Sequence, residues 1–335
     1  MGYSKIDTLE GVIPTIVISM SSARLHPLMQ QLENSQIFQV HIQEGIVGSK
    51  IIDNPRLINR QVFKFLNGRE MTPGEAGAAL AHFLVYLKIY QQQWPWTLVL
   101  EDNARLLPGA ERKIAELVGT LRSLQNLTSQ PMLIHLNLNN ARMIARKSNI
   151  QEKINLYEAL TILRTSKAYL INYDAAVIAL RDGLPLLDEP DWPHWIHEVK
   201  FLVTPNDQVT VDRSFPSEIG KRPTPAIARE RTSSRIKTAI LFCLGIEGIR
   251  YKVRTGLQDY FLWVVFDRIY RVAARFYGKA ELEHPSVVLL EVPSIQLFRR
   301  CLVGRYVRKR RILRSKQDNT FRFLSYDEVT SMIDL

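Results

Sequence analysis

Apolar runs bounded by polar turns predict a series of buried strands in the first 180 residues. A first strand is expected over residues 13–20, a second over 38–42 and a third over 97–100. A helix over residues 27–33, after a polar turn at 21–24, completes a strand–helix–strand unit, and such units build parallel sheets. Similar patterns predict further strands over 131–139, 160–163 and 168–171, and a helix over 174–182. The chain is therefore expected to have an α/β fold.

The clearest local signal is the tetrapeptide Thr72-Pro73-Gly74-Glu75. Thr72 suits an N-cap, Pro73 suits the first helical position, and Glu75 can bond back to the N-cap amide. We therefore expect a helix from Thr72 to about residue 92. Glu75 and His82 fall on one face of this helix. A purely structural interpretation, a capping glutamate and a surface histidine, stays open for both.

The candidate chemistry lies in the stretch WTLVLEDN, residues 96–103. Its apolar part reads as a buried strand that ends in Glu101, Asp102 and Asn103. Acids at a strand end are how α/β enzymes present ligands for a metal or a sugar at the carboxyl edge of a sheet. Many α/β enzymes of unrelated chemistry share this feature, so the strand end alone does not identify the reaction.

Length and composition narrow the class of protein. The 335 residues suffice for one large domain with an extension. The N-terminus lacks a secretory signal pattern, and no stretch approaches the roughly 18 uncharged apolar residues that span a bilayer. Two cysteines are too few for a disulfide framework, which favours a reducing cytosol.

The net charge of +11 is concentrated in the C-terminal third. Residues 229–316 hold 20 Lys and Arg against 7 Asp and Glu, a net of +13, which leaves −2 for the remainder. We therefore predict a near-neutral domain over residues 10–225 and a basic, mainly helical extension over 226–335. Such a cationic region attracts phosphate-rich partners such as anionic lipid.

The extension has the pattern of a membrane-surface region. Over residues 262–276 three arginines at helical spacing share one face, and apolar residues cover the rest. This pattern is typical of a helix lying in a membrane interface. A polybasic segment over 299–316 follows, where each Lys or Arg gains about 1 kcal/mol at an anionic leaflet. The alternative, helices that merely cover the catalytic domain with solvated arginines, stays open. The residues expected to contact the membrane are Arg268, Arg271, Arg275, Arg308, Lys309, Arg310 and Arg311.

The order of motifs resembles glycosyltransferase family 25, of the lipopolysaccharide and lipooligosaccharide β-galactosyltransferase type. The resemblance spans about residues 12–220 and is most specific between Thr72 and Gly109. The blocks that carry it are IVISMSSAR ending at Arg24, TPGEAGAALAHFLVYLKI from Thr72, LVLEDNARLLPG from Leu98, TSKAYLINYDAA from Thr165 and PDWPHW from Pro190.

The resemblance implies a GT-A-type, Rossmann-like nucleotide-sugar transferase domain. It also implies a UDP-sugar donor, a divalent metal (Mn or Mg), inversion at the sugar carbon and an outer-core lipooligosaccharide acceptor. Three positions depart from the family pattern. Asn103 stands where the family has a second Asp, Ala81 where it has Ser, and Gln43-Glu44 where it has Val-Asp.

Residue roles follow from the same resemblance. Asp102 and Asn103 would hold the metal, and Glu101 would contact the donor and assist catalysis. Asp191 would be the general base, with Asp212 as a competitor for that role. The remaining roles are donor binding by Arg24, Glu44, Glu75 and His82, and acceptor stacking by Trp192 and Trp195. His194 and His197 are candidates for additional metal ligands, and a purely structural role stays open for both.

The sequence thus predicts a cytoplasmic enzyme, peripheral on the inner face of the membrane, that adds a hexose, most readily galactose, to a lipid-linked oligosaccharide. One alternative is a degenerate relative that binds the UDP-sugar without turnover. Another is a nucleic-acid-binding protein, but the tail shows no zinc-ligand pattern, defensible helix-turn-helix or aromatic ribonucleoprotein motif. No nucleic-acid partner is therefore expected.

Overall fold

The structure is a computed structural model, and it describes residues 11–60, 63, 70–124, 130–137, 143–147, 155–159, 166–186, 194–215, 287–289 and 326–333. The strand predicted at 160–163 lies outside these residues. The predicted membrane segment 262–276 and the polybasic segment 299–316 lie outside them as well, and so do the residues expected to contact the membrane: Arg268, Arg271, Arg275, Arg308, Lys309, Arg310 and Arg311.

A nine-stranded sheet forms the centre of the described fold, in the order β11-β6-β7-β9-β5-β8-β3-β1-β2. A second, two-stranded sheet pairs β4 (Ala104–Leu106) with β10 (Val209–Val211). The strands of the large sheet are β1 (Ile13–Ser19), β2 (Phe38–Glu44), β3 (Trp96–Glu101), β5 (Met132–His135), β6 (Met143–Lys147), β7 (Tyr157–Ala159), β8 (Ala168–Asn172), β9 (Lys200–Val203) and β11 (Val287–Leu289).

The sheet is mixed. Strand β1 runs parallel to β2, as the strand–helix–strand pattern predicted, and it also runs parallel to β3. Strand β8, however, runs antiparallel to both of its neighbours, β3 and β5. The α/β prediction is confirmed, whereas the parallel pairing holds for only part of the sheet.

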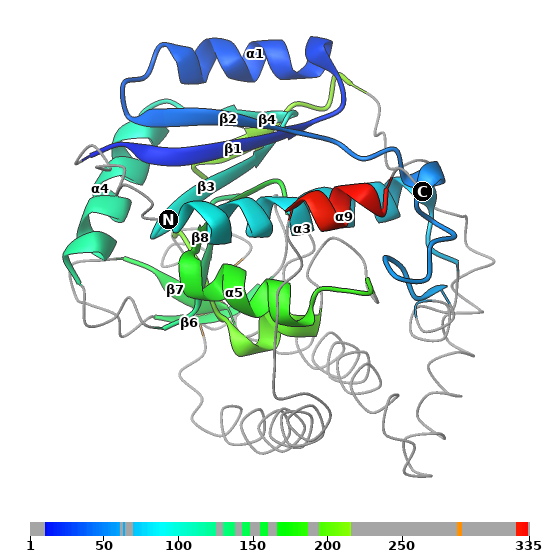
Figure 1. Cartoon of the computed structure of the whole chain (residues 1–335). Coiled ribbons are helices and arrows are strands. Elements are labelled where there is room, and N and C mark those ends of the chain that lie inside the picture. The colour runs from blue at the N-terminus through cyan, green and yellow to red at the C-terminus, as the bar shows by residue number, and fades with distance from the viewer. Residues whose placement is uncertain are drawn as a thin grey trace, which may run out of the picture.

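Helices cover both faces of the sheet (Figure 1). On one face lie α1 (Ser22–Glu33) and α4 (Ala110–Ser123), and on the other α3 (Pro73–Gln92) and α5 (Tyr173–Asp182). Successive side chains of β1 point to opposite faces of the sheet. Ile16 packs with α3 and α5, in what we call the α3 layer, and Val17 packs with α1 and α4, in the α1 layer. All seven residues of β1 are buried, as expected for a strand covered on both sides.

Two helix predictions have different outcomes. The TPGE helix is confirmed, because the Thr72 side chain accepts from the Glu75 amide and the Glu75 side chain accepts from the Thr72 amide, which completes a capping box. The start of α1 at residue 27 is wrong. The helix begins at Ser22, and Pro27 lies inside it. The predicted polar turn is therefore the first turn of α1, which places Arg24 on a buried helical position.

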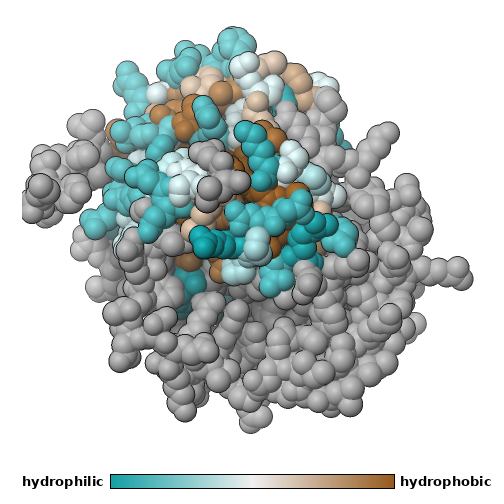
Figure 2. Space-filling model, turned by 45° about the vertical axis from the view of Figure 1, so that its right-hand side comes forward, coloured by the Kyte–Doolittle hydropathy of each residue, from teal (hydrophilic) through white to brown (hydrophobic). Residues whose placement is uncertain are grey.

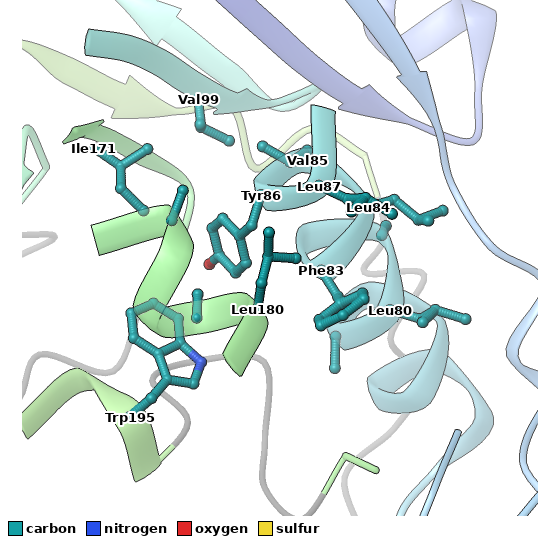
Figure 3. Close-up of a cluster of buried hydrophobic side chains, with 14 of the residues drawn as sticks. Leu80, Phe83, Leu84, Val85, Tyr86, Leu87, Val99, Ile171, Leu180 and Trp195 are labelled. Atoms are coloured by element: carbon teal, nitrogen blue, oxygen red, sulfur yellow. The ribbon is translucent and has the colours of Figure 1, made fainter. Parts of the chain in front are cut away.

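The α3 layer has a dense apolar interior (Figure 3). Tyr86 of α3 points between the helices toward Trp195, and the two rings meet edge-on with centroids 5.4 Å apart. Trp195 belongs to η2 (His194–Glu198) and is 2% exposed. The outer surface of the described residues is mostly hydrophilic on the face in Figure 2, with smaller hydrophobic areas between.

Two glycines let the loop after β2 lie directly on α3. A Cβ on Gly48, in η1 (Gly48–Lys50), would come within 1.6 Å of the Pro73 carbonyl oxygen. A Cβ on Gly77 would come within 2.1 Å of the Ile46 carbonyl oxygen. Because these neighbours are backbone atoms, they cannot rotate away.

We expect Gly48→Ala to lower the free energy of unfolding by about 1–3 kcal/mol or more, since the loop must move off the helix. Chemical denaturation measures this change. The matched control is Gly119→Ala within α4, where a new Cβ meets open space. That change is expected to stabilise by roughly 0.5–1 kcal/mol. Equal stability of the two variants would contradict the close packing.

The C-terminal end of the described chain packs against α3. Helix α9 (Tyr326–Ser331) lies beside α3 (Figure 1), and Val329 is fully buried in the α3 layer. The Asn54 side-chain amide donates to the Met332 carbonyl oxygen at 2.9 Å. Residues near position 330 are therefore part of the core, although the sequence pattern assigns them to the extension.

Val329→Ala is expected to lower the free energy of unfolding by about 2 kcal/mol, because two buried carbons are lost and a cavity is left. Thermal or urea unfolding of the full chain tests this. Ser331→Ala, an exposed position on the same helix, serves as the control and should change stability little. An unchanged midpoint for Val329→Ala would show that α9 does not dock in solution.

Candidate active site

One cavity of about 760 Å³ opens at the carboxyl ends of β1 and β3. Its walls come from six places: the end of β1 with α1, the loop after β2, the first turns of α3, the end of β3, the residue before β8 (Ala168–Asn172), and the end of β10 with the segment after it. The lining includes Ser19, Arg24, Gly45, Gly48, Gly77, His82, Glu101, Asp102, Asn103, Lys167, Asp212 and Arg213. Arg24, His82, Glu101 and Asp102, which come from distant segments, therefore meet in one place.

Asp102 is the most enclosed charge of the cavity. Its backbone amide donates to the Ile18 carbonyl oxygen at 3.0 Å, which extends the β1–β3 pairing by one residue. An Arg24 guanidinium nitrogen lies 2.8 Å from Oδ1, and the Ser19 hydroxyl donates to Oδ2 at 2.9 Å. Arg24 and Asp102 are 9% and 4% exposed, so the two charges form a nearly buried ion pair.

Glu101 lies beside His82. Its Oε1 is 3.8 Å from His82 Nε2 and accepts a hydrogen bond from the Ser166 hydroxyl at 3.1 Å. Burial alone would raise the pKa of Glu101. The nearby His82 ring, the charge of Lys167 and the Ser166 hydrogen bond outweigh burial and hold this pKa below its ordinary value. Glu101 is therefore ionised at neutral pH.

His82 is held from behind by two buried tyrosines. Its Nδ1 lies 2.8 Å from the Tyr169 hydroxyl, which in turn donates to the Tyr86 hydroxyl at 3.3 Å. Burial raises the pKa of both phenols far above the ordinary value, so both stay neutral. If Tyr169 gives its proton to Tyr86, His82 Nδ1 must be the donor to Tyr169. His82 Nε2 then faces Glu101.

Arg105 ties the strand end to the β10 segment. Its guanidinium donates to the Asp102 carbonyl oxygen at 2.9 Å and pairs with Asp212 Oδ2 at 2.9 Å. The Asp212 amide donates to the Asn103 carbonyl oxygen, which continues the β4–β10 pairing. Hydrogen bonds from Ser214 and the Arg105 charge, against a smaller effect of desolvation, hold the pKa of Asp212 below its ordinary value. Asp212 is thus a weak base.

Asn103 differs from its two acidic neighbours. Its Oδ1 is buried at the cavity and has no hydrogen-bond partner among the described residues. A buried acceptor without a partner costs free energy on the order of 1–3 kcal/mol. Such an atom points to a ligand that supplies a hydrogen-bond donor or a cation.

The possible metal ligands of the cavity do not form a preformed divalent-metal site. Mn and Mg take about six oxygen ligands, with carboxylates supplying the compensating charge. Here both oxygens of Asp102 are engaged by Arg24 and Ser19, and Asn103 is uncharged. The described residues hold no cluster of three His, Cys, Asp or Glu suited to a metal. A metal held by Asp102 and Asn103 stays a prediction, and the ion pair with Arg24 argues against it.

Among the residues predicted to bind the sugar donor, Arg24, His82 and Glu101 line the cavity. Their contact with the sugar donor stays a prediction. Glu44 ends β2 and is exposed; the cavity lining starts one residue later, at Gly45. The donor-contact prediction for Glu75 is wrong. Its carboxylate is fully buried and accepts from the backbone amide and the hydroxyl of Thr72.

The acceptor predictions have different outcomes. The prediction that Trp195 stacks on the acceptor is wrong, because its side chain is buried in the α3 layer against Tyr86. Asp191 and Trp192 lie outside the described residues, and so do the side chains of His194 and His197, which fall within η2. The sequence interpretation missed Ser19, Arg105 and Lys167. Ser19 could have been suspected because it ends β1, and Arg105 because it lies two residues after the acidic motif.

A charged cavity at the carboxyl ends of sheet strands is typical of α/β enzymes that bind nucleotides or sugars. The family model described as glycosyltransferase family 25 (LPS biosynthesis protein) matches residues 12–178, and the chain belongs to this family. No curated protein matches the chain. The matched range contains Arg24, His82 and the acidic strand end. Asp212 and Arg213 reach the same cavity from beyond it.

Membership of this family makes the chain a glycosyltransferase of LPS biosynthesis, with a sugar donor and a glycan acceptor. Among the helices that the structure describes, none combines the length and apolarity required to cross a membrane.

Proposed function

We propose that the chain is an inverting, GT-A-type hexosyltransferase that moves galactose from a UDP-sugar to a lipooligosaccharide or another lipid-linked glycan. The observation that carries the proposal is the cavity at the end of β3. There Glu101 and Asp102 meet Arg24 and His82 inside the range that matches the family. The volume of about 760 Å³ suits a ligand of the size of a nucleotide sugar.

The reaction requires a general base for the acceptor hydroxyl and carboxylates near the sugar ring. The acceptor hydroxyl oxygen attacks the anomeric carbon as the bond from that carbon to the diphosphate oxygen breaks, and the electron pair leaves with UDP. A base removes the hydroxyl proton, and nearby carboxylates stabilise the positive charge that develops on the ring. Glu101 is ionised and lines the cavity, so we assign the last role to it.

Asp191 is the proposed general base, and it lies outside the described residues. Its competitor, Asp212, lines the cavity but has a lowered pKa and a bound Arg105. A general base works best with a pKa near the working pH, so Asp212 is the poorer candidate. Its contacts suit a positioning residue, because Arg105 connects it to the backbone of Asp102.

A donor screen tests the proposal. The full chain is incubated with each UDP-hexose and truncated lipooligosaccharide, with and without Mn, and transfer is followed by mass spectrometry. The proposal predicts transfer from UDP-galactose above every other donor. Transfer from no nucleotide sugar to any lipid-linked glycan would contradict it, and so would binding of UDP-sugar without turnover.

We also propose that the enzyme works on the cytoplasmic side of the inner membrane, held to anionic lipid by its basic extension. Truncation is a poor test, since α9 at the chain end packs into the core. Replacing Arg308, Lys309, Arg310 and Arg311 with glutamine keeps α9 and removes four charges. Vesicles of anionic lipid should bind the native chain at least about tenfold more tightly than this variant.

A further inference from the structure

Each carboxylate of the cavity has a basic side chain as its neighbour. Asp102 pairs with Arg24, Asp212 pairs with Arg105, and Glu101 lies beside His82. Lys167 and Arg213 line the cavity as well. The chain itself thus supplies the positive charge that a divalent ion would otherwise bring to the acids of such a site.

Asn103 fits the same arrangement. A carboxylate facing a diphosphate requires a metal ion between them, because like charges in contact cost several kilocalories per mole. A carboxamide requires none, since its N–H₂ group can donate to a phosphate oxygen. Its buried Oδ1, which has no partner among the described residues, can accept from a hydroxyl of the same ligand.

Arg24 can serve both a carboxylate and a phosphate. A guanidinium carries five N–H donors in a fixed plane, so pairing with one anion does not prevent it from donating to another. Asp102 holds Arg24 at the wall of the cavity through a contact of 2.8 Å. The pair therefore positions a cation where the strand end faces the ligand.

We propose that this chain binds the diphosphate of its donor without a divalent metal. Arg24, Lys167 and Arg213 neutralise the phosphates, and the Asn103 amide donates a hydrogen bond to them. The inference rests on the proposed function, because it assumes a nucleoside-diphosphate sugar as the ligand. It departs from the expectation of Mn or Mg that the family resemblance carries.

Calorimetric titration of the full chain with UDP tests the inference. In EDTA and in Mn, the native chain should bind UDP with affinities within about threefold of each other, because Arg24, Lys167, Arg213 and the Asn103 amide would contact the phosphates directly. Asn103→Asp should bind UDP at least about tenfold more weakly in EDTA and recover most of that loss in Mn. Asn34→Asp, an exposed change of the same kind on the surface, should behave like the native chain.

Mn binding without nucleotide gives a second readout, by electron paramagnetic resonance. The native chain should leave the signal of free Mn unchanged, and Asn103→Asp should reduce it. UDP binding that requires Mn in the native chain, or Mn bound tightly by the native chain, would overturn the inference while leaving the proposed function intact. Failure to bind UDP in either buffer would overturn both. The measurements on the native chain stand even if a variant does not fold.

Discussion

Replacing Arg24 with methionine is expected to lower the free energy of unfolding by about 3–5 kcal/mol, because Asp102 would be left as an uncompensated charge in a nearly buried position. Equilibrium unfolding in urea, followed by circular dichroism, measures this loss. Transfer activity should fall with it, since the variant removes a cation from the cavity wall. No other single substitution of a described residue discussed above is expected to reduce stability as strongly.

A double variant separates the two effects. Arg24→Met combined with Asp102→Leu removes both charges, so stability should return to within about 2 kcal/mol of the native chain. Activity should not return, because the cavity has lost both the Arg24 guanidinium and the Asp102 carboxylate. If Arg24→Met alone unfolds like the native chain, the ion pair does not exist in solution. Recovery of activity in the double variant would show that neither residue takes part in the reaction.

Replacing Glu101 with glutamine is expected to lower kcat by roughly 10²–10³-fold, the usual loss when one preorganised electrostatic group is removed. The side chain keeps its shape, but it loses the charge that would face the developing positive charge of the sugar ring. Steady-state kinetics with the donor found in the screen measure kcat and KM separately. The loss should appear in kcat, because the charge of Glu101 acts mainly on the transition state.

Glu198→Gln is the matched control for this variant. Glu198 pairs with Arg181 at 2.7 Å and does not belong to the described lining of the cavity. It should therefore leave kcat within about twofold of the native value. A Glu101→Gln enzyme with native kcat would contradict the role of Glu101, and an equal loss in both variants would point to a general effect on folding.

Local sequence signals predicted the elements that form the cavity. The TPGE capping box depends on residues three positions apart, so its chemistry can be read directly from the chain. The apolar run before Glu101 likewise predicted β3 and the placement of acids at its end. Helix α4 was missed, although its buried positions Ile114, Val118 and Leu121 have helical spacing. A search of residues 110–123 for that period would have found it.

Pairing between distant residues could not be predicted in the same way. Arg24 and Asp102 are far apart in the chain and meet only because β1 pairs with β3. The contact of Arg105 with Asp212 depends on the two-stranded sheet, whose strands are three residues each. Strands this short carry no distinct pattern, so sequence alone does not indicate which of them meet.

The errors for Trp195 and Glu75 have one cause. Both residue types serve binding sites as well as cores and caps, and their neighbours in the chain do not show which side of the fold they face. Trp195 turns inward onto Tyr86, and Glu75 turns back onto Thr72. Burial, which decides between these roles, depends on how α3 packs against α5 and η2.

A crystal structure of the full chain with UDP tests the central claim most directly, namely that the cavity at the end of β3 is the donor site. The account predicts the diphosphate in the space between the end of β3 and the first turns of α3, within hydrogen-bond distance of the Arg24 guanidinium. A nucleotide bound elsewhere, with the Arg24–Asp102 pair facing an empty cavity, would contradict it.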